Sequence, residues 1–476
     1  MATATLTTNI PARLDRLPWS SFHMLLIFAL GITWLLDGLE VTIVGAMGAV
    51  LQDRHTLSLS SGDVGAVASC YVAGAVAGAL VFGWLADRFG RKKVFYATLG
   101  IYVLGAACTA FSWNFVSFAV FRCLTGIGIG GEYAAINSAI DEMMPARLRG
   151  RIDLAVNGTY WLGAALGAAA TIWLLDPKLL GIDIGWRLGF GIGAILAIGI
   201  LLLRRFVPES PRWLVTHGYP DEAEAAMTYI EDRVAGRGRK LGEVAETMTI
   251  HPRKSYGLGL IAKVMLGQYR ARAFLVFVLM AAQAFLYNAL FFTYALVLVH
   301  FYGVNQGRAG IYLMPLAAGN FLGPLLLGHF FDTIGRRIMI AATYTLAGLL
   351  LAITGYLFAI GALTAMTQTL AWCAIFFFAS AAASAAYLTA SEVFPLEMRA
   401  LAIAIFYALG TAAGGIVAPF LFGRLIGTGS RWYIFDGYLI AAGCMLFAAA
   451  VAAILGIDAE GKSLESISAP LSAAAE

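Results

Sequence analysis

The chain has 476 residues, of which 60% are hydrophobic and only 13% are charged. An ordinary soluble domain has about 25% charged residues, so this composition argues against a water-soluble globular protein. The net charge of +4 is small, and acidic and basic residues alternate in the polar segments, which argues against nucleic acid as a partner.

Long apolar stretches explain the composition. A helix that spans a lipid bilayer needs roughly 20 apolar residues. Stretches of this kind cover residues 22–50, 62–86, 94–113, 115–141, 152–175, 187–206, 272–300, 309–331, 338–361, 364–391, 400–425 and 432–457. We therefore predict an all-α polytopic membrane protein with twelve transmembrane helices. All five cysteines lie inside these stretches, where we expect packed thiols rather than disulfides.

Lysine and arginine cluster in alternate connections between the stretches, around residues 88–93, 147–151, 204–272 and 336–337. The positive-inside rule places such connections in the cytoplasm. We therefore predict a multi-pass protein of the inner (plasma) membrane with both termini in the cytoplasm. The first 21 residues lead into a full-length span, which is unlike a cleaved secretory signal.

The first stretch carries two carboxylates, Asp37 and Glu40, near its middle. A lipid-facing charge at that depth costs roughly 2.5 kcal/mol or more. Residues three apart project to nearly one face of a helix. We therefore expect both acids to face a cavity inside the protein.

Two motifs occur twice, at nearly the same offset. GWLADRFGRKK (83–93) and GHFFDTIGRR (328–337) share the pattern G-x-x-x-D-x-x-G-R-[KR], 245 residues apart. EMMPARLR (142–149) and EVFPLEMR (392–399) share E-x-x-P-x-x-x-R, 250 residues apart. The chain is therefore predicted to consist of two pseudo-symmetric six-helix bundles.

The resulting organisation has five parts. We assign a cytoplasmic tail to 1–21, the N-terminal bundle to 22–206, a cytoplasmic linker to 207–271, the C-terminal bundle to 272–457 and a second tail to 458–476. Within the linker, residues 220–235 have the pattern of an amphipathic helix that lies at the membrane surface. Residues 1–15 and 466–476 are expected to be disordered.

The repeated motifs bring acids and arginines together at the cytoplasmic face. Glycine permits a tight turn, and arginine binds carboxylates through two hydrogen bonds. We predict a charged gate formed by the following residues: Asp87, Arg88, Gly90, Arg91, Glu142, Arg149, Asp332, Arg336, Glu392 and Arg399.

The fourth stretch supplies a basic partner for the first. Arg122 lies about seven residues, or roughly 10 Å, below the outer surface, and Glu40 about ten residues, or roughly 15 Å, below it. The two side chains are therefore at similar depths. Glu132 is a third acid inside the membrane, and it is open whether it takes part in coupling or forms a structural hydrogen bond.

Polar and aromatic residues within the spans are candidates for binding a solute. In the seventh stretch, Gln283, Tyr287 and Asn288 lie on or near one face. The remaining candidates are Asn157, Tyr160 and Trp161 in the fifth, and Asn320, Gln368, Tyr387 and Tyr407 in later spans. A single polar residue in a span more often bonds to a neighbouring helix than to a ligand. We expect about half of this set to contact the solute.

The repeated G-x-x-x-D-x-x-G-R-[KR] motif resembles the signature of the major facilitator superfamily along the whole chain. Three further segments, VPESPRWL (207–214), RCLTGIGIG (122–130) and EGKSLE (460–465), are similar to its sugar-porter branch. The resemblance implies gate ion pairs that hold an outward-facing state. It also implies that an acid at the position of Glu40 pairs with Arg122. Glu132 stands where a sugar porter usually has a small neutral residue, and glycine-Glu-aromatic resembles carriers of organic acids.

Together these features predict a transporter and not an enzyme, with no cofactor and no metal site, and a monomer embedded in the bilayer. The preferred hypothesis is a proton-driven symporter that imports a small polar solute, either a sugar or polyol or an organic acid. Glu40 is the predicted main proton carrier, with Asp37 either assisting or binding the solute. The alternative is a proton-driven antiporter that exports metabolites or drugs.

Overall fold

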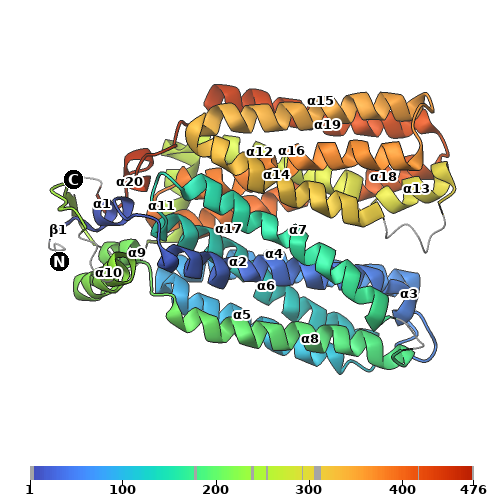
Figure 1. The fold of residues 1–476 in the computed structure, drawn as a ribbon, viewed down its shortest axis with the longest axis horizontal. Helices are drawn as coiled ribbons and strands as arrows, with labels where there is room; N and C mark the ends of the chain where they lie inside the picture. Colours follow the sequence, from blue (N-terminus) through green and yellow to red (C-terminus); the bar gives the residue numbers. More distant parts are fainter. Residues whose placement is uncertain are drawn as a thin grey trace.

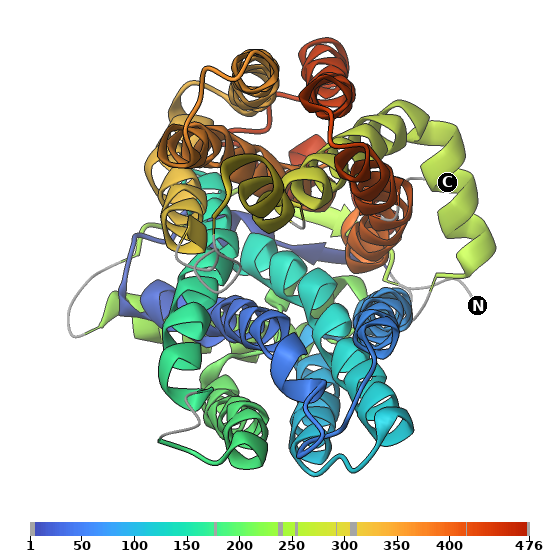
Figure 2. The same ribbon diagram turned by 90° about the vertical axis from the view of Figure 1, so that its right-hand side faces the viewer.

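The computed structural model of the chain describes residues 5–175, 179–236, 241–252, 256–291, 293–304, 312–415 and 417–473. Its long helices run nearly parallel in one bundle (Figure 1). Viewed end-on, the helices from the first part of the sequence form one half, and those from the second part form the other (Figure 2). The predicted all-α fold is confirmed.

Six long helices form the first half. They are α2 (Ser21–Ala46), α4 (Ser61–Phe89), α5 (Arg91–Ala110), α6 (Phe115–Met143), α7 (Arg149–Leu174) and α8 (Ile182–Leu203). The short α3 (Gly48–Leu51) follows α2, and a 3-10 turn, η1 (Arg204–Phe206), extends α8.

The second half repeats this order with two interrupted spans. Its helices are α12 (Arg270–Phe291) continued by α13 (Tyr294–Tyr302), α14 (Leu313–Thr333), α15 (Arg336–Ala359), α16 (Ala365–Glu392), α17 (Arg399–Gly410) continued by α18 (Val417–Gly427), and α19 (Arg431–Leu455). A π-helical turn, η5 (Thr411–Gly415), joins α17 to α18.

Eleven helices within the described residues are long and apolar enough to cross a membrane. The twelfth span of the bundle is α7, which lies among the others (Figure 1). Its first nine residues include Arg149, Arg151, Asp153 and Asn157. These polar residues lower its hydropathy, and most of them are buried against protein rather than exposed to lipid.

One end of the bundle is covered by short elements, and we call it the linker end; the opposite end is the far end (Figure 1). The cover consists of α1 (Ile10–Asp15), α9 (Pro211–Thr216), α10 (Pro220–Ala235), α11 (Leu258–Lys263) with a π-helical turn η2 (Val264–Gln268), a 3-10 turn η4 (Leu396–Met398), α20 (Leu464–Ile467) and a two-stranded sheet. In that sheet β1 (Leu6–Thr8) pairs antiparallel with β2 (Met248–Ile250). Helix α10 confirms the predicted amphipathic segment, since it buries Ala223, Met227, Ile230 and Val234 along one face.

The expected disorder of the tails is wrong for their described parts. Residues 5–15 form β1 and α1, and α1 buries Ile10 and Leu14. At the other terminus, the backbone N–H groups of Leu471 and Ser472 donate to the Glu397 carboxylate, both at 3.0 Å. The composition of the tails did not reveal these contacts because the partners lie in distant parts of the chain.

Helix ends repeat between the two halves. Helices α6 and α16 start with equivalent capping boxes, formed by Asn114 with Ser117 and by Thr364 with Thr367. Helices α5 and α15 each follow a glycine with a positive φ, Gly90 (96°) and Gly335 (122°). Only glycine adopts such angles without strain, which explains its place in both copies of the repeated motif.

Candidate binding site

A cavity of about 250 Å³ lies between the two halves of the bundle. Helices α2, α6 and α7 line it from the first half, and α12, α16 and α17 line it from the second. The lining residues are Trp34, Val41, Tyr133, Asn157, Tyr160, Trp161, Gln283, Tyr287, Ser380, Ala383, Ser384, Tyr387 and Tyr407.

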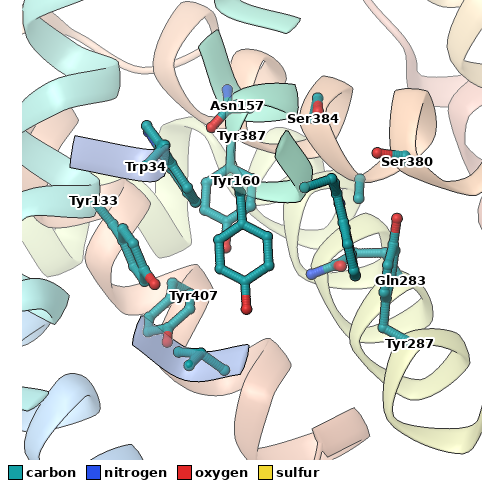
Figure 3. A pocket seen from close by; sticks show the side chains of 13 residues that line it. Trp34, Tyr133, Asn157, Tyr160, Gln283, Tyr287, Ser380, Ser384, Tyr387 and Tyr407 are labelled. Atoms are coloured by element: carbon teal, nitrogen blue, oxygen red, sulfur yellow. The ribbon is translucent and has the colours of Figure 1, made fainter. Parts of the chain in front are cut away.

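Aromatic rings form most of the cavity wall. Trp34 and Tyr133 stack with ring centroids 4.5 Å apart, and they face Gln283 and Tyr287 across the cavity (Figure 3). On the opposite wall Trp161 stacks on Tyr287 at 5.7 Å. Such rings offer flat apolar faces with a hydroxyl or indole N–H at the edge. The cavity is therefore suited to a flat solute with a few polar groups.

The polar groups of the cavity belong mostly to aromatic side chains. The amide nitrogen of Asn157 is used by Oδ1 of Asn137, at 3.1 Å, and by the backbone oxygen of Asp153, at 2.9 Å. The other polar lining groups are the tyrosine hydroxyls, the indole N–H groups of Trp34 and Trp161, and the side chains of Gln283, Ser380 and Ser384. No lysine or arginine lines the described cavity.

Seven of the ten predicted solute-binding residues line the cavity: Asn157, Tyr160, Trp161, Gln283, Tyr287, Tyr387 and Tyr407. The other three lie elsewhere. Asn320 accepts a hydrogen bond from the Tyr287 hydroxyl at 2.6 Å, and so lies behind the wall. Gln368 accepts from Tyr302 at 3.0 Å near the far end, and the amide of Asn288 donates to the backbone of Ala284 at 2.7 Å.

Sequence reasoning missed part of the lining although signals for it exist. Ser380 and Ser384 were missed, although they precede the predicted Tyr387 by seven and three residues and so share its helix face. Trp34 precedes Asp37 by three residues and so shares the face of the first acid. These polar and aromatic periodicities identify the inward face of α16 and α2.

The predicted pair of Glu40 and Arg122 forms between α2 and α6. Arg122 donates to one oxygen of the Glu40 carboxylate, and the Tyr102 hydroxyl donates to the other. The guanidinium also lies 4.4 Å from the centroid of the Tyr71 ring. Glu40 and Arg122 are 3% and 2% exposed, so the pair is removed from both water and lipid.

Asp37 connects this pair to the cavity. Its two oxygens accept hydrogen bonds from the hydroxyls of Tyr71, at 2.8 Å, and Tyr133. Tyr71 packs against Arg122, whereas Tyr133 belongs to the cavity wall. Asp37 is therefore joined to the solute site through Tyr133 and to the Glu40–Arg122 pair through Tyr71.

Glu132 lies apart from these groups, with a partner that the sequence did not suggest. Its Oε2 accepts from Arg204 at 3.1 Å, and Arg204 also donates to the Thr33 hydroxyl at 2.6 Å. The guanidinium of Arg204 lies 4.4 Å from the Phe95 ring centroid. This arrangement ties α6 to α2, α5 and the end of α8, and it favours the structural alternative for Glu132.

At the linker end, the repeated motifs form two equivalent clusters. In the first, Arg91 bonds to Asp87 at 3.0 Å and to Glu142 at 2.7 Å. In the second, Arg336 bonds to Asp332 at 2.8 Å and to Glu392 at 3.0 Å.

Each cluster also reaches across to the other half. Asp87 accepts from the backbone N–H of Leu401 at 2.9 Å, at the start of α17. Asp332 equivalently accepts from the N–H of Arg151 at 2.8 Å, at the start of α7.

Two ion pairs also connect the two halves of the bundle at the linker end. Arg399 lies 3.7 Å from Glu142, and Arg149 lies 3.3 Å from Glu392. Both pairs join one half to the other, so the linker end is closed in this structure.

Two of the predicted gate residues lie outside this ion-pair network. Arg88 is exposed, and its guanidinium packs over the Trp84 ring at 5.3 Å. Gly90 makes the turn instead of a polar contact: a Cβ atom there would collide with the Glu209 carboxylate.

The segments 207–214 and 460–465 support the gate. Glu209 accepts from the backbone N–H of Arg91 at 2.9 Å, and Glu460 accepts from that of Arg336 at 3.2 Å. Each carboxylate thus caps the helix that carries a gate arginine. Arg212 joins the two segments and the N-terminal tail through Glu465 and Asp15, both at 3.1 Å.

The chain is similar to known transporters along most of its length. Residues 25–471 match the family model "Sugar (and other) transporter". The niacin transporter NiaP of Acinetobacter baylyi is 28% identical, over 96% of this chain and 99% of that protein. Myo-inositol transporter 2 of Schizosaccharomyces pombe is 28% identical, over 80% of this chain and 70% of that protein.

The fold is that of a solved major facilitator protein. The structure of the proton:xylose symporter XylE bound to 6-bromo-6-deoxy-D-glucose has a TM-score of 0.78 at 19% identity, covering 94% of this chain and 98% of that chain. The family match covers nearly the whole chain, and the relatives are transporters rather than enzymes. The chain therefore belongs to the sugar (and other) transporter family, has the major facilitator fold, and is a membrane transporter.

Proposed function

We propose that this transporter is a proton-driven symporter that imports a small planar ring compound bearing a carboxylate. The single observation that carries this proposal is the composition of the cavity wall. Seven of its thirteen residues are aromatic: Trp34, Tyr133, Tyr160, Trp161, Tyr287, Tyr387 and Tyr407. Flat ring solutes bury their faces well against such side chains.

A sugar or polyol fits this wall less well. Each hydroxyl that leaves water without a hydrogen-bond partner costs roughly 1–3 kcal/mol in proteins. Besides the hydroxyl and indole N–H groups at the edges of its aromatic rings, the described cavity offers Gln283, Ser380 and Ser384, while the Asn157 amide nitrogen is already used. This small set of polar side chains therefore favours the organic-acid alternative over the polyol alternative.

The charges beside the cavity support uptake of a proton with an anion. Asp37, Glu40 and Arg122 carry a net charge of −1 when all are ionised. An anion that enters alone adds a second uncompensated charge in a site without a lining lysine or arginine. An anion that enters with one proton leaves the total unchanged, which favours symport over antiport.

The comparison with NiaP supports the same class of solute. That relative aligns along almost its whole length and is named for niacin, a pyridine ring with a carboxyl group. The inositol transporter aligns along a smaller share of both chains. The linker end is assigned to the cytoplasm because the basic connections lie there.

Uptake into liposomes that contain the purified protein tests the proposal. With an inward proton gradient, we expect labelled nicotinate to accumulate, and benzoate to compete more strongly than nicotinamide or myo-inositol. Accumulation of inositol or xylose without competition by nicotinate would contradict the ring-carboxylate assignment. Accumulation only with an outward-directed proton gradient would instead support the antiporter.

The aromatic wall can be tested directly. Replacing Trp161→Ala removes a stacked ring and should weaken solute binding about tenfold, corresponding to about 1.4 kcal/mol. Trp161→Phe should retain most of the affinity. Trp173→Ala is the matched control, because Trp173 lies on the same helix with 65% of its surface exposed.

A further inference from the structure

A chain of polar side chains leads from the cavity at Asn157 to the carboxylates of Asp141 and Asp153. The proposed coupling through Glu40 and Asp37 does not use these two groups. Asn157 lies at the edge of the cavity (Figure 3) and donates to Oδ1 of Asn137 on the neighbouring helix α6 at 3.1 Å. Its amide nitrogen also lies 3.2 Å from Oδ2 of Asp153. The path thus begins at the solute site and continues toward the linker end.

Asp141 and Asp153 occupy matching positions on α6 and α7. Helix α6 runs toward the linker end, and α7 returns from it. Asp141 follows Asn137 by four residues, and Asp153 precedes Asn157 by four, so each aspartate lies about one turn closer to the linker end than its asparagine. The hydrogen bond between Asn157 and Asn137 holds α7 against α6 one turn away from the aspartates, which places the two carboxyl groups near each other.

The pair is fully buried, and three of its four carboxylate oxygens lack a hydrogen-bond donor among the described residues. Both aspartates are 0% exposed. Within the described residues, both oxygens of Asp141, Oδ1 of Asp153 and Oδ1 of Asn157 have no hydrogen-bond partner. All four atoms are acceptors when the carboxylates are ionised. A proton on either carboxyl supplies the missing donor.

Neighbouring charges compensate the pair only in part. The positive charges of Arg149 on α7, Arg336 on α15 and Arg399 on α17 are near enough to stabilise the carboxylates, and the negative charge of Glu392 on α16 opposes them. Arg149 and Arg336 bond to Glu392, and Arg399 is directed to Glu142, which lies beside Asp141 in the sequence.

The four gate arginines are therefore matched by four gate carboxylates. Those eight groups are Asp87, Arg91, Glu142, Arg149, Asp332, Arg336, Glu392 and Arg399. The two aspartates remain in excess of this balance. Two like charges side by side in a buried site are strongly unfavourable, so one of them is neutral.

We propose that Asp141 and Asp153 take up one proton between them from the cavity side, along the path that begins at Asn157, while the linker end is closed, and release it toward the linker side when the gate opens. Opening admits water, which solvates both carboxylates and accepts the proton. The inference rests on the proposed proton coupling and adds a second proton-binding site to that of Glu40. It follows that each transport cycle carries one proton more than Glu40 alone provides.

Infrared spectroscopy of the purified protein tests the shared proton without measuring transport. At pH 8, wild type should show a protonated carboxyl C=O band that shifts in deuterated water. Asp141→Asn and Asp153→Asn should each remove the same band, because one proton is shared, and Glu40→Gln should retain it. Absence of the band in wild type, or its persistence in both single variants, would overturn the proposal.

The transported proton is tested by measuring proton and solute uptake together in liposomes. Asp153→Asn should lower the proton-to-solute ratio by one while solute counterflow continues. Asp183→Asn, the same change at a half-exposed far-end position, is the matched control and should keep the wild-type ratio. If Asp153→Asn does not fold, Asp141→Asn provides the same measurement.

The outcomes separate the two proposals. Wild type that transports solute without proton uptake contradicts the proposed function, whereas the infrared result still decides whether the pair holds a proton. Wild type with proton uptake and an unchanged ratio in Asp153→Asn overturns the further inference alone. Transport that requires sodium ions, and loses this requirement in Asp153→Asn, also overturns it, because the pair then binds a metal ion.

Discussion

At the scale of single residues, two acids of α2 have different surroundings. Glu40 forms an ion pair with Arg122, whereas Asp37 accepts hydrogen bonds only from the tyrosines 71 and 133 among the described residues. A proton that neutralises Glu40 removes the attraction that holds Arg122. Protonation of Glu40 leaves Asp37, which is linked to Arg122 through Tyr71, as the remaining carboxylate of α2 beside that guanidinium.

Glu40→Gln imitates the protonated carboxyl and should remove the proton that this residue carries in each cycle. We expect gradient-driven accumulation to fall to what the remaining proton of the Asp141–Asp153 pair supports, while solute counterflow continues, since exchange requires no net proton movement. Labelled uptake into liposomes, with and without a pH gradient, measures both. Glu40→Asp keeps the charge and should retain accumulation. Accumulation by Glu40→Gln equal to that of wild type would remove this residue from the coupling mechanism.

At the scale of elements, the gate is built from helix ends. The N-termini of α7 and α17 carry unpaired N–H groups and a partial positive charge, which favour a carboxylate. Asp332 and Asp87 supply these carboxylates from the opposite half. Each contact is lost when the halves separate, so it stabilises only the state closed at the linker end.

Asp332→Asn should therefore shift the population toward a state open at the linker end. Loss of a charged hydrogen bond costs about 1.5–3 kcal/mol, and we expect a tenfold or greater change in the equilibrium. Reaction of an engineered Ala383→Cys with an impermeant thiol reagent from the linker side, in a background without native cysteines, measures this shift. Asp458→Asn makes the same change at an exposed position of the same end and serves as the control. In this control Ala383→Cys should react at the same rate as it does without a second substitution.

At the scale of the whole molecule, the cover at the linker end joins both tails and the linker to the gate. Glu231 on α10 bonds to Arg13 at 2.7 Å and to Arg16, and Trp213 donates to the backbone oxygen of Asp87 at 2.9 Å. His217 stacks on Trp213 with centroids 4.4 Å apart. The cover is thus positioned to hold the closed gate.

The stability of this cover should fall in acid. Burial lowers the pKa of His217 to about 4, below its usual value of about 6.5. Between these values the unfolded segment binds more protons than the folded one, so stability is lost as pH falls. We expect amide exchange in α9 and α10 to report a loss of about 2–3 kcal/mol between pH 7 and 4.5.

His217→Phe keeps a ring on Trp213 and should remove most of this pH dependence. His300→Phe changes an exposed histidine of α13 and should leave it unchanged. An equal loss of protection in wild type and His217→Phe would assign the effect to other groups.

The sequence by itself determined the features that depend on local patterns. Apolar length predicted the spans, the repeated motifs predicted two halves, and the spacing of apolar residues predicted α10. Gln283 and Tyr287 were found in the same way, since residues four apart share a helix face. The pairing of Glu40 with Arg122 could be predicted because both residues lie at similar depths in the membrane.

Only the tertiary structure decided which polar residues meet. Asn320 and Gln368 bond to tyrosines of neighbouring helices, Glu132 pairs with Arg204, and Asp141 lies opposite Asp153. These partners depend on the rotation and register of helices that are far apart in the chain or joined by a turn. Hydropathy fixes that a helix crosses the membrane, but packing against its neighbours fixes which way each side chain points.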